Sequence, residues 1–146
     1  MADLTYNIVS ERLAGVVDGY RFDCHAGSGG RAGSKVEGAV NWHLQNNPLA
    51  THVGGKRSDG THNFGPIPIG RYTLQIHETR PNWVRLVADK TNVMHERAGF
   101  AIHGQGQTGS HGCIVPSDFG VLLRLIALLR GRASRGGPAP TLDAMS

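Results

Sequence analysis

The sequence comprises 146 residues, of which 39% are apolar and 18% charged, and its formal net charge is +4. This length is typical of one globular domain that buries its own core, and no apolar run is long enough to cross a bilayer as a helix. The basic balance fits an anionic partner such as nucleic acid, a membrane surface or an acidic polymer like cell wall, and does not choose among them. Nucleic acid is not expected as a partner, because the few aromatic residues are not interleaved with basic ones.

Most of the chain has a β rhythm. Alternating apolar and polar residues predict strands over 4–9, 12–17, 20–24, 71–77 and 83–87, and the short apolar run at 100–103 predicts a buried strand. Asp18-Gly19 separates the second and third of these strands and is a strong hairpin signal. Two stretches rich in glycine and polar residues, 25–38 and 45–63, are predicted to be loops. Loops of this length in a compact domain commonly line a functional cleft.

One helix is predicted, over 118–130. Ser117 is a good N-cap, Gly131 is a stop signal, and apolar residues at helical spacing give a face that packs against a sheet. Residues 132–146 are rich in small residues and proline, so we expect a disordered tail after a single domain over 1–131. The expected fold class is mainly β, a mixed β fold with one major helix.

The chemistry is concentrated in residues 100–116, FAIHGQGQTGSHGCIVP, which hold two histidines and one cysteine among glycines. Three interpretations are open: a metal site, a glycine-rich turn with inert polar residues, and a nucleophile with its base. Zinc takes three or four Cys or His ligands, commonly in close pairs. His111 and Cys113 are too close for the usual pair, and no further pair follows. The inert turn leaves the convergence of three reactive side chains unexplained.

The nucleophile interpretation explains more of this stretch. A cysteine attacks as the thiolate, so Cys113 needs a base or a positive environment. His103 ends a predicted strand, and the glycine-rich loop after it can bring Cys113 back beside it. A backbone carbonyl near Gly104 is the expected acceptor that orients the imidazole. Cys24 is interpreted as a core or strand-end thiol, because a disulfide with Cys113 would remove the nucleophile.

The residues next to the cysteine have supporting roles in this interpretation. Gly112 lets the backbone approach a substrate closely, and the amides of Gly112 and Cys113 are expected to face a developing oxyanion. Ser110 and His111 are expected to hold the turn, and His111 to add positive potential. Candidates for binding the substrate are Ser28 and Asn47, in the long loops, and Trp42, beside a loop.

Two motifs resemble those of a known enzyme family. Ile102-His103-Gly104, a short spacer and Ser110-His111-Gly112-Cys113 resemble the active-site signature of L,D-transpeptidases of the YkuD type. The segment GPIPIGRY at 65–72 resembles the upstream segment of the family, in which a proline, a glycine and an aromatic residue lead into a core strand. A weaker third match is the glycine-serine stretch at 27–30 ahead of Asn47-Pro48. The two main motifs lie within residues 65–116, about a third of the chain.

The sequence departs from the family pattern in two places. The spacer between the histidine and Ser-His-Gly-Cys is shorter than in many members, and Val115-Pro116 stand where arginine or asparagine often follows the cysteine. Both features are closer to a compact branch that resembles type VI secretion effectors acting on the peptidoglycan of competing bacteria. The N-terminal sequence has no basic start followed by an apolar stretch, so no secretory signal peptide is predicted. Secretion without a signal peptide agrees with that branch.

The resemblance implies an L,D-transpeptidase-like β-sandwich or barrel with a helix after the catalytic cysteine. Cys113 is then expected to attack the bond between diaminopimelate and the terminal D-alanine of a stem tetrapeptide, with His103 as general base and then acid. Water would resolve the thioester in an L,D-carboxypeptidase, and an amine in an L,D-transpeptidase. The resemblance implies neither a metal nor an organic cofactor.

The expected partners are a peptidoglycan stem peptide and a cognate immunity protein. We expect a monomer that acts in the periplasm of a target bacterium. Two other functions stay open: another cysteine hydrolase of peptidoglycan, such as an endopeptidase or a sortase-like enzyme, and a non-catalytic wall-binding module.

Overall fold

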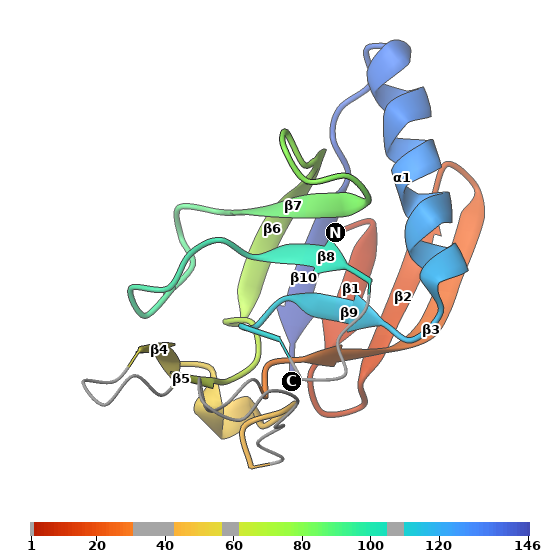
Figure 1. Ribbon diagram of the computed structural model, residues 1–146. Helices are drawn as coiled ribbons and strands as arrows, with labels where there is room; N and C mark the ends of the chain where they lie inside the picture. The colour runs from red at the N-terminus through yellow and green to blue at the C-terminus, as the bar shows by residue number, and fades with distance from the viewer. Residues whose placement is uncertain (1, 31–42, 57–61, 105–109) are drawn as a thin grey trace.

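The computed structural model of the chain describes residues 2–30, 43–56, 62–104 and 110–146. Within these residues, strands close into a barrel in the order β1-β10-β6-β7-β8-β9-β3-β2 (Figure 1). The barrel strands are β1 (Leu4–Asn7), β2 (Arg12–Val17), β3 (Tyr20–Ser28), β6 (Gly70–Ile76), β7 (Trp83–Ala88), β8 (Ala101–His103), β9 (Ile114–Pro116) and β10 (Thr141–Met145). Outside the barrel lie a 3-10 turn, η1 (Pro48–Ala50), and a small sheet of β4 (Gly54–Lys56) and β5 (His62–Phe64). The prediction of a mainly β fold with one major helix is confirmed.

The structure confirms the strongest local signal for strands in the sequence, the hairpin between the second and third strands. The hairpin predicted at Asp18-Gly19 joins β2 to β3, and both residues have positive φ, 48° and 80°, as a tight two-residue turn requires. Strand β3 continues to Ser28, so the first four residues of the loop predicted from residue 25 are strand. This extension pairs with β9 and therefore reaches the stretch that holds the cysteine.

Most barrel neighbours are antiparallel, but two pairings are parallel. β1 runs parallel to β10, and β8 runs parallel to β9 with Ile102 opposite Ile114. Both isoleucines are fully buried in the core. The parallel pairing of β8 and β9 lays the two halves of the reactive stretch side by side (Figure 1).

The single long helix is α1 (Phe119–Ser134), and both of its ends differ from the prediction. Asp118 is the N-cap in place of Ser117, and its side chain accepts a hydrogen bond from the Gly120 amide at 2.8 Å. Gly131 lies inside the helix, where a glycine costs only about 1 kcal/mol relative to alanine. The chain leaves the helix at Gly136, whose φ is +67°. The predicted apolar face is buried in the barrel core.

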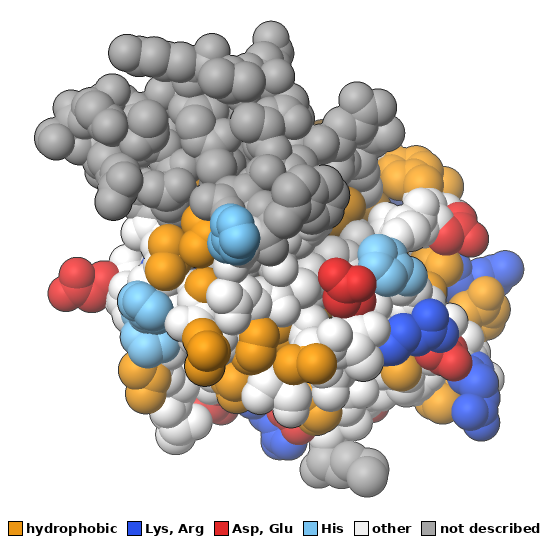
Figure 2. Space-filling view, turned by 90° about the horizontal axis from the view of Figure 1, so that it is seen from below, with side chains coloured by type: hydrophobic (Ala, Val, Ile, Leu, Met, Phe, Trp, Pro, Cys, Tyr) orange, Lys and Arg blue, Asp and Glu red, His pale blue; other side chains and the backbone are white. Residues whose placement is uncertain are grey.

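The basic residues of the last quarter are partly neutralised. Arg132 and Arg135 both pair with Asp18 at 2.9 Å, and Arg124 lies over the ring of Tyr20 at 4.8 Å. On the face seen from below, charged side chains of both signs lie together near one edge, and apolar side chains form a band across the middle (Figure 2). That face is therefore of mixed charge and does not form a one-signed patch.

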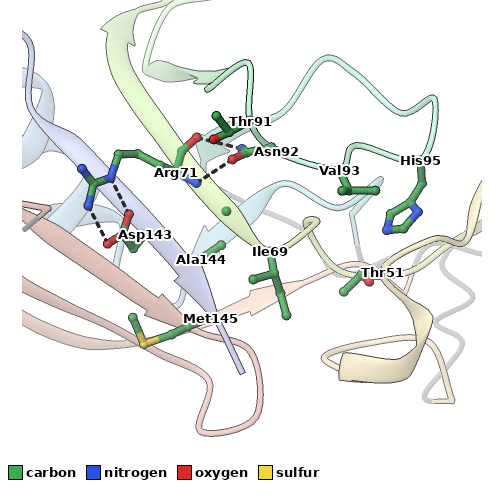
Figure 3. A pocket seen from close by; sticks show the side chains of 11 residues that line it. Thr51, Ile69, Arg71, Thr91, Asn92, Val93, His95, Asp143, Ala144 and Met145 are labelled. Carbon is green, nitrogen blue, oxygen red and sulfur yellow. Dashed lines mark hydrogen bonds and ion pairs between the residues drawn. The ribbon is translucent and has the colours of Figure 1, made fainter.

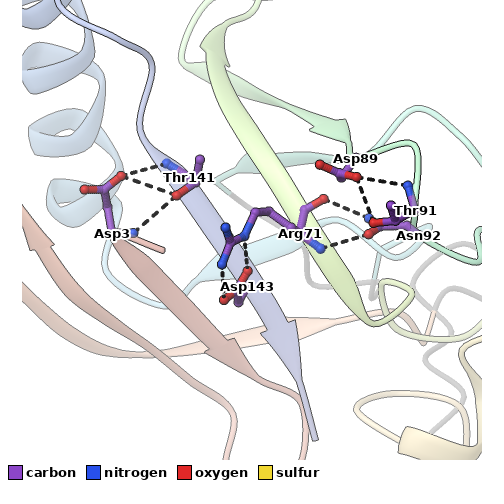
Figure 4. Close-up of polar contacts among 7 residues, drawn as sticks. All are labelled: Asp3, Arg71, Asp89, Thr91, Asn92, Thr141 and Asp143. Atoms are coloured by element: carbon purple, nitrogen blue, oxygen red, sulfur yellow. Dashed lines mark hydrogen bonds and ion pairs between the residues drawn. The ribbon is translucent and has the colours of Figure 1, made fainter. Parts of the chain in front are cut away.

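The prediction of a disordered tail over 132–146, outside a domain of 1–131, is wrong. Strand β10 lies inside the barrel between β1 and β6, with Leu142 and Ala144 turned into the core. Asp143 pairs with Arg71 of β6 at 2.8 Å (Figure 3), and the Thr141 amide donates to Asp3 Oδ2 at 2.9 Å (Figure 4). A five-residue strand needs only two inward apolar residues, which is too weak a pattern to predict a strand after a stretch rich in small residues and proline.

Candidate active site

The pairing of β8 with β9 places His103 and Cys113 next to the same buried pair of isoleucines. Ile102 of β8 lies opposite Ile114 of β9, and both are buried in the core. His103 is the last residue of β8, and Cys113 directly precedes β9. Each of the two residues that the sequence singled out is therefore the chain neighbour of one member of this pair.

The imidazole of His103 is oriented as expected from the sequence. Its Nδ1 lies 3.1 Å from the carbonyl oxygen of Gly104, and because a carbonyl only accepts, Nδ1 carries the proton. A neutral ring in this tautomer keeps a lone pair on Nε2. Burial lowers the pKa of His103, which favours the neutral form. The ring also stacks on Trp83 at 4.2 Å and 14°, and Trp83 faces it across the β7–β8 ladder.

The environment of Cys113 favours the protonated thiol. It is only 5% exposed, and burial raises its pKa. Smaller opposing effects come from the Ala101 backbone and from the charges of Arg80 and Arg97. Cys24 and Cys113 are both free thiols. A protonated thiol and a neutral imidazole whose Nε2 keeps its lone pair suit general-base activation, in which the proton moves as the sulfur attacks.

Ser110 shapes the turn that presents the cysteine. Its hydroxyl donates to the Cys113 carbonyl at 2.7 Å and accepts from the Gly29 amide at 2.9 Å. The Gly112 amide also donates to this hydroxyl, at 3.3 Å. The expected pair of oxyanion donors is therefore not observed as such, because the Gly112 amide is directed into the turn. The amide of Cys113 stays the predicted donor.

Gly112 occupies a position that a larger residue does not fit. Its φ is +106°, and a Cβ built on it lies 2.5 Å from Arg97 Nη2 and 2.6 Å from Phe100 Cε1. The backbone therefore comes close to the buried Arg97 here. This close contact fixes the position of the backbone directly before Cys113.

Ser28 lies beneath this turn, not in an open cleft. It is 1% exposed, donates to the Gly112 carbonyl at 2.8 Å and accepts from the Ile67 amide at 2.9 Å. Its hydroxyl links β3 and the GPIPIGRY segment to the turn that holds Cys113. Both hydrogen-bonding directions of Ser28 are used inside the protein, so the geometry favours a structural role over the predicted contact with a substrate.

The other two candidates for substrate binding are Asn47, from the second long loop, and Trp42. Asn47 caps η1: its side-chain oxygen accepts from the Leu49 amide at 3.0 Å, and its nitrogen donates to the His43 carbonyl at 2.8 Å. Trp42 lies outside the described residues. A substrate contact stays a prediction for both.

His111 faces away from the interior. Its ring stacks on Phe64 at 4.0 Å and 14°, and its carbonyl oxygen accepts from Arg97 Nη2 at 3.1 Å. These contacts agree with the expected role of holding the turn. The positive potential expected from His111 stays a prediction.

The sequence did not point to Arg97, although it organises the site. This arginine is 8% exposed and donates to four carbonyl oxygens at 2.5 to 3.1 Å. The acceptors are Thr51, Gly65, Pro66 and His111. Burial lowers the pKa of Arg97 to about 10, so it stays charged at neutral pH. A basic residue in a polar loop gives no signal of burial, because its acceptors come from three distant segments.

Asn46 was also missed. Its side-chain oxygen accepts from the Ser28 amide at 3.0 Å, and its nitrogen donates to Tyr6 Oη at 2.8 Å and to the Ile8 carbonyl at 2.9 Å. Asn46 therefore ties the end of β3 to the barrel core. The sequence pointed to the neighbouring Asn47 as a substrate-binding residue, because Asn47-Pro48 belongs to the weaker third match to the family.

A separate pocket of about 710 Å³ lies beside the ends of β6 and β10. Apolar side chains, among them Ile69, Val93 and Met145, line it together with His95 (Figure 3). At this pocket Arg71 pairs with Asp143, and the Arg71 amide donates to the side-chain oxygen of Asn92 (Figure 4). These polar groups are therefore already paired within the protein. His103 and Cys113 do not line this pocket.

In residues 2–30, 43–56, 62–104 and 110–146, no three His, Cys, Asp or Glu side chains are grouped as metal ligands are. Within the same residues, no helix has the length and apolar character needed to span a membrane.

Comparison with known proteins gives one structural likeness. No protein-family model matches the chain, and no curated protein matches it. Among solved structures, the chain is similar to the L,D-transpeptidase (residues 123-326) from Xylanimonas cellulosilytica DSM 15894, with a TM-score of 0.43 and 16% sequence identity. The match covers 97% of this chain and 58% of that one. A likeness of this strength does not by itself assign a family or an activity.

Proposed function

We propose that this chain is a cysteine-dependent enzyme that modifies peptidoglycan as an L,D-transpeptidase or L,D-carboxypeptidase. One observation carries the proposal: the parallel pairing of Ile102 with Ile114 sets their chain neighbours His103 and Cys113 at adjacent strands, and Nδ1 of His103 donates to the Gly104 carbonyl. The Ser-His-Gly-Cys sequence supports the choice of substrate, because it resembles the signature of that family.

The first half of the proposed reaction forms a thioester. Nε2 of His103 takes the thiol proton as Sγ of Cys113 attacks the carbonyl carbon of diaminopimelate. The oxyanion forms in front of the Cys113 amide. The tetrahedral intermediate collapses, the C–N bond breaks, and the leaving amine of D-alanine takes the proton from His103. Such a general base and acid contributes about 10²–10⁴-fold to the rate.

The second half regenerates the thiol. His103 takes a proton from water or from an incoming amine, which attacks the thioester carbonyl. The C–S bond breaks, and the proton returns to the sulfur. Water gives the tripeptide and therefore a carboxypeptidase. A D-amino acid gives an exchanged stem, and the amine of a second stem gives a cross-link.

The test is mass spectrometry of purified disaccharide-tetrapeptide incubated with the wild-type chain, with and without D-methionine. We expect loss of D-alanine, giving tripeptide or a D-methionine stem. Cys113→Ala should abolish the reaction, and Cys24→Ala, which removes the other thiol, should not. Cleavage within the stem would favour an endopeptidase. Unchanged tetrapeptide with folded, reduced protein would favour a non-catalytic wall-binding module.

We further propose that the protein is an antibacterial type VI secretion effector that acts in the periplasm of a target bacterium and is neutralised by a cognate immunity protein. The short spacer before Ser-His-Gly-Cys supports this proposal through its resemblance to the compact branch. Directing the chain to the periplasm of a Gram-negative host should arrest growth, whereas cytoplasmic expression should not. A fully toxic Cys113→Ala protein would contradict both the effector role and the proposed chemistry.

A further inference from the structure

An exposed arginine stands at the edge of the candidate active site. Arg80 lies in the turn between β6 and β7, and its guanidinium carbon is 4.4 Å from the centroid of the Trp83 ring. Trp83 in turn stacks on the ring of His103 at 4.2 Å. The cation is therefore connected to the catalytic imidazole through one aromatic ring.

The turn that carries Arg80 is held in place. Nδ1 of His77 accepts hydrogen bonds from the backbone amides of Thr79 and Arg80, at 3.2 and 3.0 Å. The edge of the His77 ring also contacts Trp83, with 5.8 Å between the ring centroids. A cation placed on a tethered turn and an aromatic face is partly preorganised for a ligand.

The charge of Arg80 is available to a ligand. Among the described residues Arg80 has no ion pair, whereas Arg85 in the following strand pairs with Glu78. Burial is the main cause of the shifted pKa values of His103 and Cys113, and the charge of Arg80 acts on both in addition. The positive field of Arg80 therefore extends to both reacting groups.

We propose that Arg80 binds the terminal carboxylate of an amino acid at the reacting carbonyl. This amino acid is either the one that leaves as the Cys113 thioester forms or the one whose amine attacks that thioester. This inference rests on the proposed function and specifies its substrate class: an acyl donor whose leaving residue ends in a free carboxylate. A guanidinium is the preferred partner of a carboxylate, because its planar N–H groups match both oxygens. In exchange, the incoming amino acid occupies the place of the leaving one, so the same arginine selects acceptors with a free carboxylate. Val115-Pro116 supply no cation after the nucleophile.

The first test needs no peptidoglycan. Iodoacetate and iodoacetamide alkylate the same thiolate, so the ratio of their rates is independent of the thiol pKa and reports on the preference for an anion. In the wild type we expect this ratio at Cys113 to exceed that in Arg80→Gln by about tenfold, equivalent to about 1.4 kcal/mol. The ratio at Cys24, measured in the same chain, should not change.

A matched control is Arg124→Gln. Arg124 also lies over an exposed ring, that of Tyr20, at 4.8 Å, but it contributes to neither of the two shifted pKa values. It should leave the ratio at Cys113 unchanged. An equal ratio in wild type and Arg80→Gln, or a Cys113 that reacts with neither reagent in the folded protein, would overturn the proposal.

The second test uses substrate. We expect wild type to process a tetrapeptide ending in D-alanine at a kcat/KM at least tenfold above that of the same peptide ending in D-alaninamide, and Arg80→Gln to lose this preference. An equal loss on both peptides would mean that Arg80 acts only through His103, and would overturn carboxylate binding. If wild type processes neither peptide but keeps the alkylation preference, the proposed function fails while the anion site at Arg80 stands.

Discussion

Replacing Arg97 tests whether one buried cation holds the turn of the candidate active site. In Arg97→Met the aliphatic volume is largely kept, but four carbonyl oxygens lose their donor. Each buried acceptor left without a partner costs about 1–3 kcal/mol, and the low end applies where water can enter. Four acceptors at about 1 kcal/mol each give a loss of about 4 kcal/mol in the free energy of unfolding. For a chain of this size that corresponds to a fall in Tm of about 8–16 °C.

Urea unfolding followed by circular dichroism measures this loss directly. Arg97→Lys should fall between wild type and Arg97→Met, because an ammonium keeps the charge but does not reach four carbonyls as a planar guanidinium does. Arg130→Met is the matched control, since Arg130 lies on the exposed side of α1, and it should change stability by less than about 0.5 kcal/mol. A loss below about 1 kcal/mol in Arg97→Met would refute the view that Arg97 clamps the site.

Three other changes follow from the structure. Leu142→Ala should cost about 2–5 kcal/mol in chemical denaturation, because the side chain is fully buried in β10; a negligible change would mean that the C-terminal strand is dispensable. Iodoacetamide alkylation of Cys113 without substrate should rise only above the pH range of an ordinary thiol, because burial raises its pKa; a plateau near neutral pH would instead indicate a preformed thiolate. Gly112→Ala should destabilise by about 3 kcal/mol or more and suppress alkylation, since its Cβ meets Arg97 and Phe100 at a strained φ; wild-type melting would contradict this.

The parts of the fold that were predictable depend on neighbours in sequence. The hairpin at Asp18-Gly19 follows from the positive φ that these residues tolerate, and the helix from apolar spacing. Strand β10 depends instead on β1, at the other end of the chain, where Leu4 pairs with Leu142. A short strand that gains its stability from distant partners leaves no local pattern strong enough to outweigh glycine and proline.

The residues of the candidate site also divide into those that the sequence indicates and those that it does not. His103 and Cys113 could be identified because their chemistry is rare and their spacing short, and the Gly104 carbonyl followed from the need to orient an imidazole. The scaffold beneath them could not be identified. Ser28 and Arg97 act through backbone carbonyls of remote loops, and a carbonyl has no residue-type signal in a sequence.

The neutral resting forms favoured for Cys113 and His103 also bear on the compartment in which the thiol can function. A low-pKa, exposed thiolate is the form that oxidants attack. Burial raises the pKa of both Cys113 and Cys24, which favours the protonated thiols and opposes their oxidation in the oxidising periplasm proposed as the place of action. In the proposed reaction, Nε2 of His103 accepts the thiol proton as the sulfur attacks a bound carbonyl. A raised resting pKa of Cys113 is therefore compatible with the proposed catalysis.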